Sequence, residues 1–471
     1  MLTLKVWCDI LFINSDREEF VMNKTKIFAD FNDITGNIKP MHCGNIGPRQ
    51  KGATLVYDFT EEFKEMGIPY TRLHDVEYPY GANQFVDIHC IFPDFDADVE
   101  SSDSYNFEPT DKYLEGIINA GGEVFYRLGE SIDHFPKPLY LDPPKDYLKW
   151  AKICEHIIMH YNEGWANGFN MGIKYWEIWN EPDNDHMWLG TPEEFYELYR
   201  VTAIYLKERF GDSIKIGGYA SSGFYMLNRE NAGDWFKTLV PYMHGFFKYI
   251  TAEETKAPMD FFSWHCYADT PEEVRLHSEY AKNMLEQYNI KNCESILDEF
   301  NMYYCFGEYA PLHRGIFTDV AASMILGQKS PLDMLMYYDF EETKVYNCAF
   351  AVTGISHKDI VRLAGFEAFS DFNKLYRLGN EVKTAGDIEE KLYILGAKSE
   401  TQGALMIVSR GFEGELDIEI AGDYTSYSIK LTDDNNEDRT PNISKTDDLL
   451  ISNGTININI GKNEILLLLL N

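Results

Sequence analysis

The sequence predicts an α/β protein, a (β/α)8 barrel followed by an all-β sandwich domain. The chain has 471 residues, which is enough for one large domain and one smaller one. From about residue 38 to 372, short apolar runs alternate with longer amphipathic ones, a pattern typical of parallel strands joined by helices. From about residue 385 onward, apolar and polar residues alternate and no helical pattern intervenes.

Eight apolar runs are expected to form the strands of the barrel. They are residues 38–43, 70–73, 123–128, 175–179, 214–218, 260–265, 295–300 and 333–338. Eight strand–helix units over this length favour a barrel that is enlarged by insertions. The alternative is a doubly wound open sheet, but no glycine-rich phosphate loop follows the first run.

Two of the intervening helices carry the same start signal. Thr191-Pro-Glu-Glu194 and Thr270-Pro-Glu-Glu273 each have the threonine, the proline and the glutamate of a capping box. Amphipathic patterns also predict helices over residues 110–120 and 145–161.

The last hundred residues predict a small sandwich of strands. Asn453-Gly454, just before the alternating run 455–460, is typical of a hairpin turn, and the final apolar run 465–470 is expected to be a strand that is buried on both faces. Residues 2–7 alternate as well. We therefore expect residues 1–30 to lend a strand to the sandwich, residues 31–375 to form the barrel and residues 376–471 to form the sandwich.

The composition excludes several partners. The chain has 42 basic and 76 acidic side chains and a net charge of −34, which repels nucleic acids and anionic membranes. It has no signal-peptide pattern and no apolar run near the roughly 20 residues that span a bilayer. Its eight cysteines are scattered without a CxxC pair, which favours a reducing cytoplasm. The oligomeric state stays open, and a homo-oligomer remains an option.

Two glutamates stand where barrel enzymes carry their function, at the carboxyl ends of strands. Glu181 follows the fourth predicted strand and Glu299 lies in the seventh, so the two should face each other across the barrel mouth. Two carboxylates about 5–5.5 Å apart can hydrolyse glycosides with retention of configuration. The acid of such a pair needs a raised pKa, which we expect burial among Trp176, Trp179 and Phe300 to provide.

Several motifs resemble one large group of enzymes. Trp179-Asn-Glu-Pro182 and Asp298-Glu-Phe-Asn301 are similar to the retaining glycosidases that share the TIM barrel, often called clan A. Within clan A the chain most resembles glycoside hydrolase family 39, the β-xylosidases and α-L-iduronidases. Four more stretches match that family in order: Arg72-Leu-His-Asp75, Tyr105-Asn-Phe107, the segment 261–267 and Glu341-Glu342.

The resemblance implies a role for each matching residue. Glu181 would be the general acid/base and Glu299 the nucleophile, while Arg72 and Tyr267 would position the nucleophile. The residues that would bind the sugar are Asn180, His74, Asp75, His265 and Asp339. It implies no cofactor and no metal ion.

The end of the eighth strand departs from the clan. Its members usually place a tryptophan there as a platform under the sugar, whereas this chain has Met336-Tyr-Tyr-Asp-Phe340. Either Tyr337 or Tyr338 would have to serve instead.

An acidic stretch at residues 94–103 begins like a calcium loop. Val99 stands where such a loop needs glycine and Tyr105 where it needs glutamate, so we interpret the stretch as a solvated insertion. We expect it to lie over the barrel mouth and to narrow the pocket.

These observations predict a retaining exo-glycosidase that is similar to β-xylosidases and acts on terminal sugars of oligosaccharides or small glycosides. One alternative is a catalytically silent carbohydrate-binding barrel. Another is a clan A enzyme of the β-galactosidase, α-L-arabinosidase or iduronidase type. A metal-dependent barrel hydrolase would need a His-x-His pair at the first strand, where the chain has Met41-His-Cys-Gly44.

Overall fold

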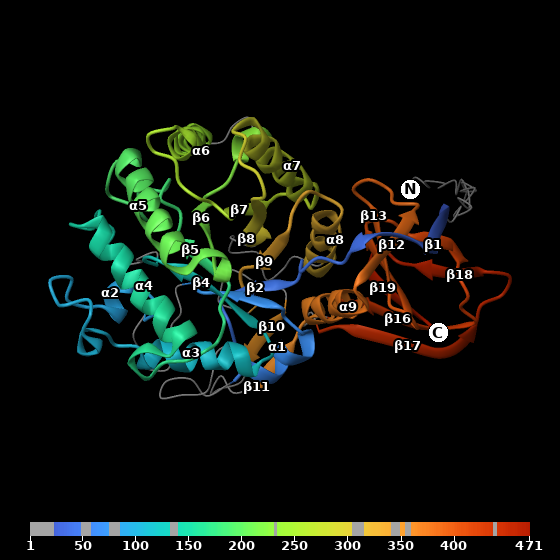
Figure 1. The fold of residues 1–471 in the computed structure, drawn as a ribbon. Coiled ribbons are helices and arrows are strands. Elements are labelled where there is room, and N and C mark those ends of the chain that lie inside the picture. Colours follow the sequence, from blue (N-terminus) through green and yellow to red (C-terminus); the bar gives the residue numbers. More distant parts are fainter. Residues whose placement is uncertain are drawn as a thin grey trace, which may run out of the picture.

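The structure is a computed structural model that describes residues 23–48, 58–74, 85–131, 140–229, 233–303, 315–340, 349–353, 359–436 and 440–471. Eight parallel strands close into a barrel, helices surround it, and a nine-stranded sheet lies at its side (Figure 1). The predicted fold class is confirmed. Among the described residues, no helix combines the length and the apolar character that a bilayer crossing requires.

The barrel strands follow the predicted order. They are β2 (Cys43–Asn45), β3 (Tyr70–Arg72), β4 (Glu123–Leu128), β5 (Tyr175–Ile178), β6 (Lys215–Ser221), β7 (Phe261–Ala268), β8 (Glu294–Met302) and β9 (Met334–Tyr337). The prediction for the first strand is wrong, because residues 38–42 precede the strand. Lys39 instead ties this segment to the turn before β9, since its Nζ donates to the carbonyl oxygens of Gly327, Ser330 and Leu332.

The barrel interior has an apolar layer below a polar one. Seven side chains form the apolar layer: Cys43, Phe125, Tyr175, Phe261, Ile296, Met334 and Met336. Side chains two residues apart on a strand face the same side. Glu177 and Asp298 therefore follow Tyr175 and Ile296 into the interior, one layer nearer the mouth.

Helices cover the outside of the barrel (Figure 1). They are α1 (Thr60–Met66), α2 (Ile88–Ile91), α3 (Glu108–Asn119), α4 (Tyr147–Glu163), α5 (Pro192–Phe210), α6 (Phe236–Thr251), α7 (Glu272–Gln287), α8 (Ile316–Gln328) and α9 (Ala364–Leu378), and β10 (Phe350–Thr353) and β11 (Asp359–Arg362) form a separate hairpin. The capping box at Thr191 is confirmed. The one at Thr270 is wrong, because α7 begins after Pro271 without a side-chain cap and the Glu273 carboxylate accepts from Asp269 N and Arg229.

The sheet at the side of the barrel combines strands from both ends of the chain. Its members are β1 (Asn23–Asn37), β12 (Asn380–Ala385), β13 (Leu392–Lys398), β14 (Gly403–Arg410), β15 (Gly414–Ala421), β16 (Ser426–Asp433), β17 (Asn442–Leu450), β18 (Thr455–Ile460) and β19 (Asn463–Leu470). β1 pairs with β12 and, in parallel, with β15. The predicted strand at residues 2–7 lies outside the described residues.

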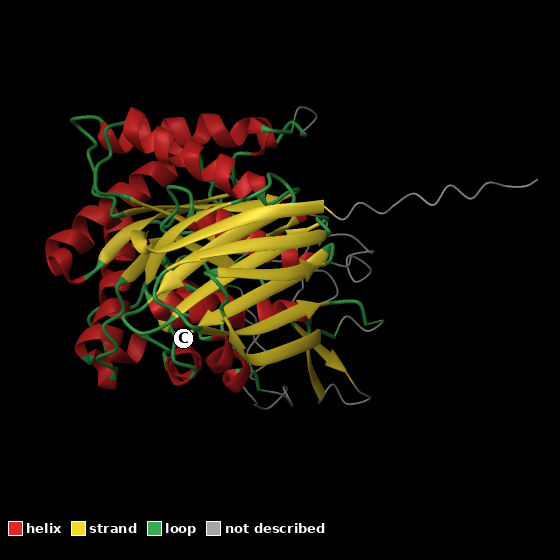
Figure 2. Ribbon diagram, turned by 90° about the vertical axis from the view of Figure 1, so that its right-hand side faces the viewer, coloured by secondary structure: helices red, strands yellow, loops and turns green. Residues whose placement is uncertain are grey.

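Figure 2 shows this sheet in front of the barrel helices, and β19 is buried on both of its faces from Ile465 to Leu468. Ile465 and Leu467 belong to the core that the barrel helices share, whereas Leu466 and Leu468 belong to a second core that is built from the sheet alone. The predicted sandwich is therefore one continuous sheet that curls around its own core. The burial of the final strand on both faces is confirmed.

The turn at Asn453-Gly454 forms as predicted, with positive φ angles of 55° and 71°. The prediction that it joins a hairpin is wrong. β17 pairs with β16 and β18 pairs with β15, so the two strands that leave the turn join opposite ends of the sheet.

The acidic loop at residues 94–103 packs along α4. The carbonyl of Ala97 accepts a hydrogen bond of 2.8 Å from Lys149, and Glu100 lies 3.4 Å from His156. These contacts place the loop on the flank of the barrel, so the expectation that it covers the barrel mouth is wrong.

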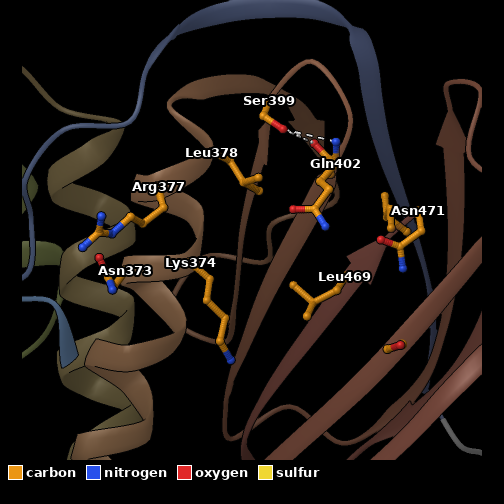
Figure 3. A pocket seen from close by; sticks show the side chains of 11 residues that line it. Asn373, Lys374, Arg377, Leu378, Ser399, Gln402, Leu469 and Asn471 are labelled. Carbon is orange, nitrogen blue, oxygen red and sulfur yellow. Dashed lines mark hydrogen bonds between the residues drawn. The ribbon is translucent and has the colours of Figure 1, made fainter. Parts of the chain in front are cut away.

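The interface between α9 and the sheet contains a cluster of buried ion pairs and a cavity. Lys430 of β16 is buried there and donates to Asp371, at 2.8 Å, and to Glu367, both on α9. A cavity of about 560 Å³ opens in the same interface, and Lys374, Leu378 and Gln402 are among its lining residues (Figure 3). The sheet is thus joined to the barrel through an ion cluster as well as through apolar contacts.

We predict that Lys430→Met lowers the free energy of unfolding by about 3 kcal/mol, because the buried carboxylate of Asp371 loses a cationic partner. Lys445→Met is the matched control, since Lys445 lies opposite Lys430 on β17 and is exposed. Urea unfolding followed by circular dichroism measures both variants. Equal losses in the two variants would contradict the role of the ion cluster.

Candidate active site

The two glutamates meet at the carboxyl ends of β5 and β8. One carboxylate oxygen of Glu181, one of Glu299 and a ring nitrogen of His265 on β7 all lie within 4.8 Å of one another. The Glu299 side chain is 8% exposed and the Glu181 side chain 15% exposed. The barrel therefore brings together residues that are far apart in the sequence and leaves both carboxylates within reach of a ligand.

Glu299 is surrounded by hydrogen-bond donors. Its Oε2 lies 3.2 Å from Asn45 Nδ2 and 2.9 Å from His74 Nε2, and its Oε1 accepts from the Tyr267 hydroxyl. Burial alone would raise the pKa of Glu299, but His265, His74 and Arg72 outweigh it and hold the pKa well below its usual range. Glu299 is therefore an oriented and ionised carboxylate, which is the state that a nucleophile requires.

Arg72 links the elements of the site from below. Its guanidinium is fully buried, and Nε lies 2.7 Å from Glu177 Oε2 and 2.9 Å from Asp298 Oδ2. Nη2 donates to Asn180 Oδ1 at 2.6 Å, and Nη1 lies 3.5 Å from Glu299 Oε2. One side chain from β3 thus fixes groups on β5 and β8.

Asp298 and Glu177 form a buried pair of carboxyl groups. Burial and the neighbouring Glu177 carboxylate raise the pKa of Asp298 well above its usual range. Burial also opposes the charge of Glu177, but Arg72 and a hydrogen bond with Asp298 lower the pKa of Glu177. We interpret the pair as a protonated Asp298 beside an ionised Glu177. The buried guanidinium of Arg72 is then balanced by the single buried charge of Glu177.

Glu181 has a different environment from Glu299. Its Oε1 lies 2.8 Å from His265 Nδ1, and its Oε2 accepts from Asn184 Nδ2 at 3.1 Å. Because His265 Nε2 also lies 3.6 Å from Asp298 Oδ1, the imidazole spans the space between the two sides of the site. The hydrogen bond to the imidazole therefore fixes the orientation of the Glu181 carboxylate.

The loop that carries Glu181 is anchored to β6. The backbone N–H of Glu181 donates to the carbonyl of Ala220 at 3.0 Å. Asp183 accepts hydrogen bonds from the hydroxyl of Ser221, at 2.9 Å, and from the hydroxyl of Ser222, at 2.7 Å. Burial raises the pKa of Asp183, and the nearby charge of Glu181 raises it further. The hydrogen bonds from Ser222 lower it, and the net result is a pKa of about 6. Glu181 is therefore held in place by its own backbone and by a buried carboxyl two residues on.

We predict that Asp183→Asn gains stability relative to the wild type as the pH rises from 5 to 8. Since the folded pKa of Asp183 is raised, the stability that its neutral form provides is lost as the pH rises from about 4 through about 6, and the amide, which does not ionise, avoids that loss. The difference in the free energy of unfolding should shift by about 1 kcal/mol in favour of the variant. Urea unfolding at both pH values measures it. Asp185→Asn, an exposed change in the same loop, is the control and should show no such shift.

The structure brings most of the predicted site residues together. Around the two glutamates lie Arg72, His74, Asn180, His265 and Tyr267. Asp339 is buried just after β9. Asp75 and the Glu341-Glu342 pair lie outside the described residues.

Of the two tyrosines at the end of β9, the structure favours Tyr338. The Tyr337 ring is fully buried against Phe340 and Phe369 of α9, on the helix side of the barrel, so it does not reach the site. The Tyr338 ring lies 5.2 Å from the ring of His74 and is partly exposed. Side chains alternate along a strand, so only one of the two neighbours can face the interior.

The three aromatic residues that we expected near Glu181 point away from it. Trp176 stacks on Tyr126 at 4.7 Å, and Trp179 packs against Trp150 of α4. Phe300 packs near Tyr337 in the same layer between strands and helices. The expectation that these rings surround the acid is therefore wrong.

Three functional residues were missed by sequence reasoning, namely Asn45, Glu177 and Asp298. Glu177 stands in an otherwise apolar strand, and Asp298 directly follows the apolar pair Ile296-Leu297; an acidic side chain at an inward position is a signal that could have revealed them. Asn45 had no such signal, because the first strand was predicted too early in the chain.

Three groups of described side chains come close enough to hold a metal ion. One is the Glu181–His265–Glu299 site itself, and the others are Asp87–His89–Glu130 and Cys266–Glu273–His277. In these other two groups a carboxylate is already paired with a guanidinium, since Arg127 lies 2.6 Å from Asp87 and Arg229 lies 3.2 Å from Glu273. These two groups are better described as ion-pair networks.

Comparison with known proteins agrees with this geometry. The family described as Glycosyl hydrolases family 39 matches residues 38–313, more than half of the chain. A β-xylosidase from Geobacillus stearothermophilus is 23% identical over 387 residues, which cover 72% of this chain and 70% of that protein.

Two solved structures show the same fold. A glucosidase from Croceicoccus marinus superposes with a TM-score of 0.73 at 18% identity, and a β-xylosidase from Caulobacter crescentus CB15 with a TM-score of 0.65 at 14% identity. In both cases the superposition covers 95% of this chain and 99% of the other.

The matched segment contains both glutamates and the strands that position them. The two carboxylates differ in exposure and in hydrogen-bond partners, and they have oxygens within 4.8 Å of each other at the mouth of a barrel. Such a pair suits the cleavage of glycosidic bonds. The chain therefore belongs to glycosyl hydrolase family 39 and is a glycosidase.

Proposed function

We propose that the protein is a retaining exo-glycosidase of the β-xylosidase type. The distance between the two carboxylates carries this proposal. Retaining enzymes hold their carboxyl groups about 5–5.5 Å apart, whereas inverting enzymes need about 6.5–9.5 Å to fit a water molecule between them. One oxygen of Glu181 and one of Glu299 lie within 4.8 Å of each other, which favours the shorter separation of retaining enzymes and supports direct attack by Glu299.

In the first step, an oxygen of Glu299 forms a bond to the anomeric carbon as the bond to the leaving oxygen breaks. Glu181 gives its proton to that oxygen, so the leaving group departs as a neutral alcohol and a covalent glycosyl-enzyme remains. In the second step, water attacks the same carbon, Glu181 takes the proton from the water, and Glu299 is released as a carboxylate. Two inversions restore the original configuration of the sugar.

The surrounding residues support this sequence of steps. Because Arg72 holds the amide oxygen of Asn180, the amide nitrogen is left to donate to a sugar hydroxyl. His265 contacts Glu181 at 2.8 Å, where it can stabilise either protonation state between the two steps. Tyr267 and His74 keep Glu299 oriented toward the anomeric carbon.

The sugar is proposed from the relatives. The match in Geobacillus stearothermophilus and the solved structure from Caulobacter crescentus are both named as β-xylosidases, which favours a terminal xylosyl unit. Hydrolysis of a panel of nitrophenyl glycosides, with β-xyloside, α-arabinoside, β-galactoside, β-glucoside and β-glucuronide, tests this choice. We expect the β-xyloside to have the highest kcat/KM, and a higher value for any other sugar would replace it. The anomer formed first, observed by proton NMR, tests retention.

Two expectations from the sequence become proposals. We propose a cytoplasmic location, which is supported by five described cysteines that are free thiols: Cys43, Cys90, Cys154, Cys266 and Cys293. We also propose domain boundaries near residues 37 and 379. The boundaries predicted at residues 30 and 375 fall inside β1 and α9, respectively.

We predict opposite responses to azide for the two glutamates. Glu299→Ala should reduce turnover by roughly 10⁴-fold or more, and added azide should give a glycosyl azide of inverted configuration. Glu181→Ala should spare substrates with very good leaving groups, which need no proton, and azide should give a product of retained configuration. NMR of the azide products measures both. An equal loss on all leaving groups for Glu181→Ala would contradict its role as the acid.

We predict that His74→Ala shifts the acid limb of the pH profile of kcat/KM to higher pH. Burial raises the pKa of Glu299 and the charged neighbours, among them His74, lower it, so removal of His74 lets the pKa rise. The nucleophile then becomes protonated, and inactive, at a higher pH than in the wild type. His74→Gln, which keeps a donor without the charge, is the control and should shift less far. An unmoved acid limb in His74→Ala would contradict this account.

A further inference from the structure

Tyr140 has three unusual features at one position. Its side chain is 58% exposed, which is high for a large aromatic residue. Its φ angle is +64°, a conformation that bulky residues rarely adopt. Its ring lies parallel to the ring of His89, with centroids 3.9 Å apart and an interplanar angle of 8°. Backbone strain combined with an exposed and oriented ring points to a functional position.

His89 gives the Tyr140 ring a fixed support. His89 Nδ1 is hydrogen-bonded to Glu130 Oε2, the backbone N–H of His89 donates to Glu130 Oε1 at 3.3 Å, and Glu130 is buried. Burial alone would lower the pKa of His89, but Cys90 and Glu130 raise it, so the imidazole carries a positive charge. A charged imidazole beneath a phenol ring adds an electrostatic attraction to the stacking. The ring is therefore held in place before any ligand arrives.

The position of this stack relates it to the acid/base. Glu130 follows the carboxyl end of β4 by two residues, so the stack lies on the mouth side of the barrel. The chain at Leu141 runs beside the loop that begins at Glu181, because the N–H of Leu189 donates to the carbonyl of Leu141 at 3.0 Å. Leu189 is itself 49% exposed. An exposed aromatic residue and an exposed aliphatic one thus occur on neighbouring segments, and one of these segments is the loop that begins at Glu181.

The leaving group of the substrate should bind on the side of the site where Glu181 lies. Glu181 must reach the glycosidic oxygen to protonate it, so the part of the substrate beyond that oxygen extends over the loops next to Glu181. A flat aromatic ring suits the apolar C–H face of a sugar ring, and it loses little conformational freedom when it binds.

We propose that Tyr140, supported by His89 and Glu130, is a platform on which the sugar unit of the leaving group stacks. The platform rests on the proposed function, because it assigns the next subsite of the same reaction. It selects substrates whose leaving group is a pyranose unit of an oligosaccharide over those with a small leaving group. It also contributes to substrate binding and not to the chemistry at the anomeric carbon.

The test compares two substrates with the same glycosyl unit, xylobiose and β-xylosyl fluoride. The leaving group of the fluoride has no ring to stack. For Tyr140→Ala we expect kcat/KM on xylobiose to fall roughly fivefold to tenfold, through KM, while the value on the fluoride stays within about twofold of the wild type. Tyr140→Phe, which keeps the ring, should match the wild type on both substrates.

Other results of this comparison would contradict either the platform at Tyr140 or the proposed sugar. Equal losses on both substrates would show that Tyr140 has a structural role, and unchanged values on both would show that its ring does not contact the leaving group. If the wild type cleaves neither xyloside, the proposed sugar is wrong. The same comparison then uses the disaccharide and the glycosyl fluoride of the sugar that the nitrophenyl panel identifies, so the platform is tested separately.

Discussion

The buried guanidinium of Arg72 is the interaction on which the rest of the site depends. A cation without access to water is tolerated only where anions and acceptors surround it, and Glu177, Asp298 and Asn180 do so from two other strands. Glu177 and Asp298 face the barrel interior because each lies two residues beyond a side chain of the apolar layer, and Asn180 follows the end of β5. A change in the register of β3, β5 or β8 would therefore separate Arg72 from its anionic partners and leave buried charges unpaired.

This arrangement gives the two carboxylates of the candidate site unequal environments. Glu299 receives hydrogen bonds from Asn45, His74 and Tyr267, which favour its ionised form. Glu181 contacts His265 and Asn184 and lies at the start of a loop, where its side chain is nearer to solvent. The difference between the two carboxylates thus follows from the number of donors that each strand end supplies, and it fits the roles proposed for them.

Sequence reasoning found what is determined locally. Seven of the eight strand runs, the capping box at Thr191 and the pairing of the two glutamates carry signals within a few residues, and the structure has them as predicted. It failed where a distant partner decides. Lys39 holds the segment before β2 out of the barrel through contacts with residues about 290 positions away, and the Glu273 carboxylate pairs with Arg229, 44 positions away. Tyr337 and Tyr338 could not be told apart because their facing depends on the register of β9.

The position of β1 affects the order in which the protein can be completed. β1 is synthesised before the barrel, yet Phe28 pairs with Ala385 and Ile27 with Ile418, which are made after it. A nascent chain therefore keeps β1 without these neighbours while the whole barrel is translated, and such a strand is prone to pair wrongly. Once the sheet forms, the pairing of β1 with β12 and β15 holds the two ends of the barrel segment together. Unfolding of the barrel from either of these ends therefore requires the sheet to open first.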